Sequence, residues 1–212
     1  MMPQTVNAVN LPLQNALNFP AAILQPPYFD AQADTAHNYG AIGAVIGHEI
    51  SHSFDDQGSL FDAEGRLANW WTQQDLDHFR AAGEALAKQY DSYRPFPDLA
   101  VNGHQTLSEN IADLAGLAVA YDAYRLALGN GNDTASKTDP MLTDQEFFIS
   151  FGQSWRTKTR EAALRTQIAT DGHAPAEFRV ATVRNLDPWY PAFSVTPGDK
   201  LYLDPKDRVR VW

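Results

Sequence analysis

The feature that most constrains this chain is the pentapeptide His48-Glu49-Ile50-Ser51-His52, an H-E-x-x-H pattern. Residues four apart on an α-helix lie on the same face, so both imidazoles can be directed at one cation. Histidine is a preferred zinc ligand, and Glu49 would lie beside the open coordination position, where a carboxylate can accept a proton from metal-bound water. On a helix, the pattern therefore predicts a catalytic zinc site.

The residues before the motif predict the helix that this interpretation needs. Ala41 and Val45 share a helical stripe with the two histidines, and Asp34 or Thr35 can cap the helix at its N-terminus. We therefore expect one helix over residues 35–55. The alternative, two ordinary solvated or core histidines, is outweighed because a chance H-E-x-x-H in such a chain has a probability on the order of 0.5%.

A second, buried helix is predicted over residues 107–128, which are apolar almost all round. Ser108 is a good N-cap, and two carboxylates, Glu109 and Asp113, lie at the start of this helix on one face. The helix dipole accounts for Glu109 better than for Asp113, which lies a turn deeper. A metal accounts for both: Glu109 as a third ligand, and Asp113 as the partner of a ligand imidazole's other N–H.

These residues together make a His-His-Glu set, the ligand set of catalytic zinc in peptidases, with the fourth position left for water. Asp55 and Asp56 follow His52 on the same side of the helix, and one of them could orient the His52 ring. Solvated charges at the end of a helix are an equally good interpretation of the two aspartates. The spacing alone leaves this choice open.

The bulk composition bounds the class of protein. At 212 residues and 44% hydrophobic, the chain is one domain or a compact piece of one. Its formal net charge of -10 argues against nucleic acid and against anionic membranes as partners. No apolar run approaches the roughly 20 residues of a membrane span, and the first residues do not resemble a signal peptide. We expect a soluble chain without disulfides, because it has no cysteine.

The remaining chain carries weaker signals. Residues 5–29 read as extended segments interrupted by prolines, with an edge strand containing Asn7 and Ala8. The pattern alone favours an ordinary capping hairpin over a strand that pairs with an extended peptide. A helix is expected from about 72 to 90, and the terminal VRVW should pack back against the body.

Two further segments complete this reading. Residues 130–142 are predicted to be a polar surface loop, and Thr143 begins a capping box that opens the next helix. His173 lies in a glycine-bounded loop before a helix that Pro175 can start. Taken alone, His173 reads as a surface histidine.

Six separated segments, in one order along the chain, point to a known family. They are VNAVN (6–10), FPAAILQPPYFD (19–30), GHEISHSFDDQG (47–58), LSENIADLAG (107–116), DGHAPAEFR (171–179) and the terminal VRVW. Together they resemble the C-terminal catalytic region of the neprilysin-like zinc endopeptidases, the M13 peptidases. The resemblance implies a mainly α, thermolysin-like zincin (gluzincin) domain with a small β portion over residues 1–212, in which residues 1–30 form the substrate-binding strand and hairpin region.

The resemblance also implies roles that spacing does not show. Asn7 and Ala8 match the family's clamp on the substrate backbone, which reverses the preference for an ordinary hairpin. His173 matches the residue that stabilises the tetrahedral oxyanion. Arg179 matches the residue that anchors carbonyl or carboxylate groups of the substrate, and Asp113 matches the partner of a zinc-bound histidine.

The implied activity is that of a zinc metalloendopeptidase acting on small peptides, with Zn²⁺ as its cofactor. A bulky hydrophobic residue is expected just after the scissile bond. The residues matching the pocket for that side chain are Ile23, Tyr28, Val45 and Trp155.

Three departures from the family pattern qualify these expectations. The family usually has an aromatic residue after Asn-Ala, where this chain has Val9-Asn10. Animal members carry cysteines, one of them where Val209 stands, so a bacterial origin is expected. Family members also have several hundred residues before this region, which build a helical lobe over the cleft, often after a membrane anchor or signal peptide. We therefore expect a C-terminal portion of an extracytoplasmic parent; a fragment that binds zinc or peptide without cleaving is the alternative.

Overall fold

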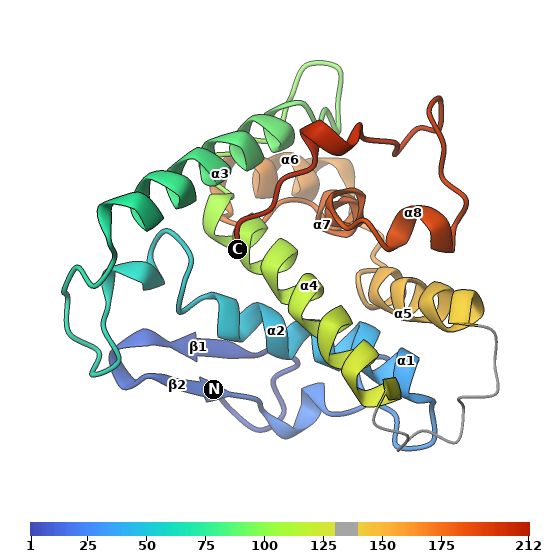
Figure 1. Cartoon of the computed structure of the whole chain (residues 1–212), viewed down its shortest axis with the longest axis horizontal. Helices are drawn as coiled ribbons and strands as arrows, with labels where there is room; N and C mark the ends of the chain where they lie inside the picture. The colour runs from blue at the N-terminus through green and yellow to red at the C-terminus, as the bar shows by residue number, and fades with distance from the viewer. Residues whose placement is uncertain (130–139) are drawn as a thin grey trace.

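The computed structural model describes residues 1–129 and 140–212, leaving aside the side chains of 140–142, and helices carry most of the fold (Figure 1). The helices are α1 (Thr35–Asn38), α2 (Ala44–Ser51), α3 (Gln73–Asp91), α4 (Leu107–Gly129), α5 (Pro140–Ser154), α6 (Glu161–Thr170), α7 (Ala176–Val180) and α8 (Trp189–Ala192). Within the described residues, the β portion is one antiparallel hairpin of β1 (Val9–Leu11) and β2 (Ala16–Asn18). The predicted mainly α class with a small β portion is confirmed.

Helix α4 lies in the middle of the molecule, between α2 and the C-terminal segments (Figure 1). Its sequence is apolar on all sides, which is typical of a helix surrounded by protein. Ile111 and Tyr124 of α4 are fully buried, as are Tyr90 of α3 and Phe147 of α5. One continuous core therefore forms around α4, and the elements packed against it hold the start of this helix in place.

Two glycines let the main chains of α2 and α4 touch. A Cβ added to Gly47 would lie 2.3 Å from the carbonyl oxygen of Gly116, and one added to Gly116 would lie 2.3 Å from the amide nitrogen of His48. No other residue type fits at such separations, because real Cβ atoms essentially never come this close to other atoms. This contact brings the acidic start of α4 beside the H-E-x-x-H segment.

The segment expected as one helix over residues 35–55 is built in three parts. Asp34 caps α1 by accepting a hydrogen bond from the His37 amide at 2.8 Å, a π-helical stretch (Tyr39–Gly43) follows, and α2 ends at Ser51. The helix therefore ends four residues before the predicted boundary. The chain turns there because Ser53 donates to the Ile50 carbonyl and Phe54 to the Ser51 carbonyl, which replaces the α-helical bonding pattern.

The predicted edge strand starts later than expected. Val9 pairs with Asn18, so Asn7 and Ala8 precede β1 instead of lying within it. Continuing the pairing would place Asn7 opposite Pro20, which has no N–H to donate to a ladder. Asn7 is exposed and Ala8 is buried.

The remaining boundaries agree with the sequence to within a few residues. Thr72 caps α3 through its hydroxyl, close to the predicted start of that helix. The next helix begins at Pro140, a turn before the predicted capping box at Thr143; most of the predicted loop over residues 130–142 lies outside the described residues. The C-terminal VRVW packs back as expected, with Val209 and Val211 buried.

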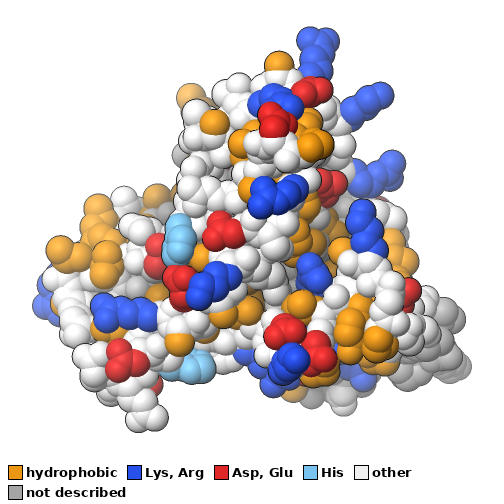
Figure 2. Space-filling model, turned by 90° about the horizontal axis from the view of Figure 1, so that it is seen from above, with side chains coloured by type: hydrophobic (Ala, Val, Ile, Leu, Met, Phe, Trp, Pro, Cys, Tyr) orange, Lys and Arg blue, Asp and Glu red, His pale blue; other side chains and the backbone are white. Residues whose placement is uncertain are grey.

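Two further features concern the outside of the molecule: the kinds of side chain on its surface and the length of its apolar helices. The face in Figure 2 mixes acidic, basic and hydrophobic side chains. Among the residues that the model describes, no helix has the length and apolar character needed to cross a membrane.

Candidate active site

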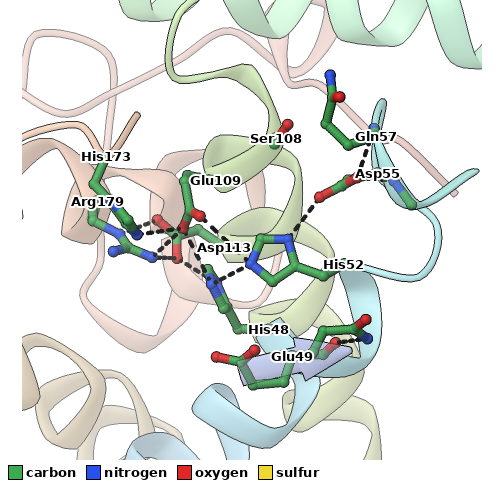
Figure 3. Close-up of polar contacts among 12 residues, drawn as sticks. His48, Glu49, His52, Asp55, Gln57, Ser108, Glu109, Asp113, His173 and Arg179 are labelled. Atoms are coloured by element: carbon green, nitrogen blue, oxygen red, sulfur yellow. Dashed lines mark hydrogen bonds and ion pairs between the residues drawn. The ribbon is translucent and has the colours of Figure 1, made fainter. Parts of the chain in front are cut away.

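Three side chains from two helices point at a common centre (Figure 3). His48 lies on α2, His52 immediately follows this helix, and Glu109 lies in the first turn of α4. The two histidine Nε2 atoms are 3.0 Å apart, and Glu109 carboxylate oxygens lie 3.3 Å from Nε2 of His48 and 3.6 Å from Nε2 of His52. The structure thus brings together the three residues that the sequence predicts as metal ligands.

The outer ring nitrogens of both histidines face carboxylates. Nδ1 of His48 lies 2.9 Å from Asp113, and Nδ1 of His52 lies 2.6 Å from Asp55. Asp55 is hydrogen-bonded to Nδ1 of His52, and the nearby Asp113 carboxylate favours a proton on Nδ1 of His48, an arrangement that turns the Nε2 lone pairs inward. Two such lone pairs only 3.0 Å apart repel each other unless a proton or a metal cation lies between them.

The two aspartates after the motif have different partners. Asp55 contacts His52 and also accepts hydrogen bonds from the main-chain N–H groups of Gln57 and Gly58, at 2.8 and 2.7 Å. Asp56 instead accepts a hydrogen bond from the Ser108 hydroxyl at 2.6 Å. Asp55 is therefore placed to orient the His52 ring, which favours that interpretation over two merely solvated charges.

The donor set fits zinc. Tetrahedral zinc with bonds of roughly 2.0–2.1 Å holds its donor atoms about 3.3 Å apart, close to the three separations above. The ligand atoms of His48, His52 and Glu109 all lie within 4.8 Å of one another. Burial alone would lower the pKa of His48, but the Asp113 and Glu109 carboxylates outweigh it and raise that pKa to about 9. The charge that favours a proton on His48 equally favours a metal cation.

Glu49 is buried beside these ligands, with 6% of its surface exposed. Burial raises the pKa of its carboxyl, while the charge that His48 and His52 can carry and the main-chain N–H of Asn10 act in the opposite direction. A raised pKa suits a group that must accept a proton and later return it.

Arg179 is a buried residue that contacts the ligand set from α7. Its guanidinium donates two hydrogen bonds of 2.7 Å to Asp113 and stacks over the Trp155 ring at 4.0 Å from the ring centre. Although burial alone would raise the pKa of Asp113, Arg179 and His48 hold it well below its usual range. Arg179 also lies 3.3 Å from Glu109 and borders the cleft, so it lies within reach of both the ligand set and a bound substrate.

His173 approaches the ligand set from the loop before α7. Its Nε2 lies 3.2 Å from a Glu109 oxygen, and its Nδ1 lies 2.7 Å from Asp171. Asp171 is a site residue that the sequence pattern does not single out. The signal was an aspartate two residues before the histidine, where the short spacing lets its carboxylate also accept the His173 amide at 2.9 Å.

One cleft of about 570 Å³ is lined by the three candidate ligands together with Glu49, Asp113, His173 and Arg179. Asn7 and Ala8 line it from the N-terminal segment, next to the metal-ligand set. Its apolar lining includes the four residues matched to the specificity pocket, namely Ile23, Tyr28, Val45 and Trp155. The first three belong to a small hydrophobic cluster with Ala8, and Trp155 packs against the main core.

Known proteins are similar to this chain in sequence. The family model described as "Peptidase family M13" matches residues 7–209. The neutral endopeptidase of Lactobacillus helveticus is 40% identical over 214 residues, covering 100% of this chain and 31% of the relative. Neprilysin-3 of Drosophila melanogaster is 39% identical over 215 residues, covering 100% of this chain and 27% of the relative.

A solved structure extends the likeness to three dimensions. The crystal structure of the Mycobacterium tuberculosis zinc metalloprotease Zmp1 in complex with an inhibitor superposes with a TM-score of 0.93 at 50% identity, covering 99% of this chain and 33% of that one. The chain spans about a third or less of the length of these relatives. Because the family match runs over nearly the whole sequence, and the fold is that of its thermolysin-like members, the chain belongs to peptidase family M13.

Proposed function

We propose that this chain is the catalytic domain of a zinc metalloendopeptidase that hydrolyses small peptides. The observation that carries the proposal is the convergence of His48, His52 and Glu109, with Glu49 buried next to them. The relatives called neutral endopeptidase and zinc metalloprotease support it. Residues 1–212 form the catalytic domain in this proposal, within an extracytoplasmic parent protein.

His48, His52 and Glu109 would hold the zinc ion, with Asp113 and Asp55 fixing the two rings. When bound, zinc would supply a Lewis acid that polarises the scissile carbonyl and lowers the pKa of a water molecule. Glu49 accepts the proton of the attacking water and passes it to the leaving amine.

His173 stabilises the negative charge that develops on the carbonyl oxygen, a type of contribution often worth about 3 kcal/mol. Asp171 holds its Nδ1, which leaves Nε2 turned towards the ligand set. This orientation suits donation to an oxygen that lies beside the metal.

The cleft provides the substrate contacts in this proposal. Asn7 and Ala8 hold the peptide backbone, and Arg179 binds a carbonyl or carboxylate group further along. The apolar lining would accept the bulky hydrophobic side chain after the scissile bond, because burying such a side chain is favourable by about 1.5–3 kcal/mol. The residues of that pocket are Ile23, Tyr28, Val45 and Trp155.

The test compares the wild type with Glu49→Gln on a short peptide with a central Phe or Leu. We expect cleavage before that residue, inhibition by a chelator, and recovery with zinc. Glu49→Gln should lower kcat/KM by roughly 10²–10⁴ because the general base is lost, while zinc content stays the same. Turnover by the variant at the wild-type rate would remove Glu49 from the mechanism.

A second candidate function is binding of zinc or peptide without efficient cleavage. The observation that favours it is that the chain spans about a third or less of its relatives, so groups that position substrate could lie in the rest of a longer protein. Zinc-loaded chain that binds the peptide but leaves it intact would support this candidate against the first.

A further inference from the structure

Asn10 joins the N-terminal hairpin to the helix that carries the H-E-x-x-H motif. It is the middle residue of β1 and only 9% exposed. Its side-chain Nδ2 donates to the main-chain oxygen of Glu49 at 2.7 Å and to the hydroxyl of Ser53 at 2.8 Å. These bonds span 39 and 43 residues of sequence, so they connect two separate walls of the cleft.

The bond to Glu49 satisfies a carbonyl group left free by the end of α2. In a continuing helix, the Glu49 carbonyl would accept from the Ser53 amide, four residues later. The Ser53 amide instead donates to Ile50 at 3.1 Å, where the chain leaves the helix. Asn10 therefore supplies the missing donor and caps the C-terminal turn of α2 from a neighbouring strand.

When the Asn10 side chain makes this contact, its own carbonyl oxygen is left without a hydrogen-bond partner in the described part of the chain. A carbonyl oxygen can only accept a hydrogen bond, so Nδ2 must face Glu49. The Oδ1 atom is then buried without a hydrogen-bond partner among the described residues. Buried unsatisfied groups are uncommon in native proteins and call for an explanation, which a residue placed only to fill space would not provide.

We propose that Asn10 is a positioning residue that fixes Glu49 relative to a peptide bound beside β1. The role rests on the proposed peptidase function. Glu49 is the acid–base residue of the proposed mechanism and the neighbouring Asn7 and Ala8 hold the substrate. A bond between β1 and Glu49 therefore sets the distance between base and scissile bond.

Two substitutions separate the lost donor from added charge. Asn10→Asp keeps the shape but replaces the donor with an acceptor, and Asn10→Leu removes the donor without adding charge. For both variants we expect kcat to fall by roughly 10- to 100-fold, the range seen when a reacting group is misplaced by about 1 Å, with little change in KM. Zinc content should equal that of the wild type.

Asn15→Gly is the matched control. Asn15 has the same side chain on the same hairpin and also donates to a distant carbonyl, that of Ala63 at 3.1 Å, but it does not touch α2. Its φ of 43° is one that glycine adopts freely, so the backbone is retained. We expect unchanged kcat. Ser53→Ala, which leaves the bond to Glu49 in place, should cost less than either change at Asn10.

Hydrogen exchange provides a readout that does not depend on turnover. Loss of the cap should speed amide exchange over residues 50–54 in Asn10→Leu, but not in Asn15→Gly. If the zinc-loaded wild type does not cleave peptides, the proposed peptidase function fails, while exchange still decides whether Asn10 caps α2. Unchanged exchange over residues 50–54 overturns the role of Asn10, as does an effect confined to KM.

Discussion

The two histidines of the metal site are held in different ways. His48 faces Asp113, which pairs with Arg179, which in turn stacks on Trp155. This side is therefore a chain of buried and half-buried groups from α2, α4, α7 and the residue after α5. His52 faces Asp55, which is held by main-chain N–H groups two and three residues further along. The first side depends on the whole fold and the second on one local turn. Breaking them should therefore have different consequences for stability.

The largest loss of stability should come from changing the main-chain contact between α2 and α4, on which the whole metal site depends. Gly47→Ala places a methyl group against the main chain of α4, which no side-chain movement can relieve. We expect the free energy of unfolding to fall by more than about 4 kcal/mol, because the two helices must separate, and zinc binding to be lost. Denaturant unfolding measures the change.

Gly83→Ala is the control for that substitution. Gly83 lies inside α3, and its nearest neighbour for an added Cβ is the Leu107 side chain at 3.7 Å, an ordinary contact. Alanine there should raise the free energy of unfolding by about 0.5–1 kcal/mol. Equal tolerance of both substitutions would show that α2 and α4 are not in main-chain contact.

The next effect should come from the His48 side. Arg179→Leu leaves Asp113 buried without its cation, which we expect to cost about 3–5 kcal/mol of unfolding free energy. The control is Arg165→Leu, because Arg165 also donates twice to an aspartate, Asp98, and also stacks on an aromatic ring. Its side chain is 36% exposed, against 8% for Arg179. That control should lower the unfolding free energy far less than Arg179→Leu does, because solvent screens an ion pair at the surface. Similar losses in the two variants would contradict the contrast between the two sides.

The smallest effect on stability should come from the His52 side. Asp55→Asn keeps an oxygen for the turn but removes the charge that orients His52, so zinc affinity should fall by roughly 10- to 100-fold. Unfolding free energy without metal should change by about 1 kcal/mol, because one local contact is altered. Asp56→Asn, in which the altered carboxylate faces Ser108, should leave zinc affinity unchanged. A competitive chelator titration decides between them.

The sequence predicts most reliably the features that depend on the spacing of side chains along one helix. The ligands His48, His52 and Glu109 could be predicted because two signals are local in the sequence. One is the helical spacing of the histidines, and the other is a pair of carboxylates at the start of an otherwise apolar helix. The buried α4 could be named because its apolar residues surround the helix. These predictions need no knowledge of neighbouring elements.

Long-range partners could not be predicted in the same way. The early end of α2 follows from the turn around Asp55, and its cap comes from Asn10 on a strand about 40 residues earlier. The resemblance places Arg179 at the substrate, but its bidentate contact with Asp113 depends on α4 and α7 packing together. The strand boundary at Val9 could not be predicted because it depends on Pro20, which follows β2 and has no N–H with which to extend the pairing.

The most direct test is the zinc-to-protein ratio of the dialysed wild type and of Glu109→Gln. We expect one zinc per wild-type chain and strong loss of zinc in the variant, because α4 then no longer supplies its charged ligand to the two histidines of the H-E-x-x-H motif. A wild type without zinc after incubation with the metal, or a variant that retains the full amount, would contradict the site.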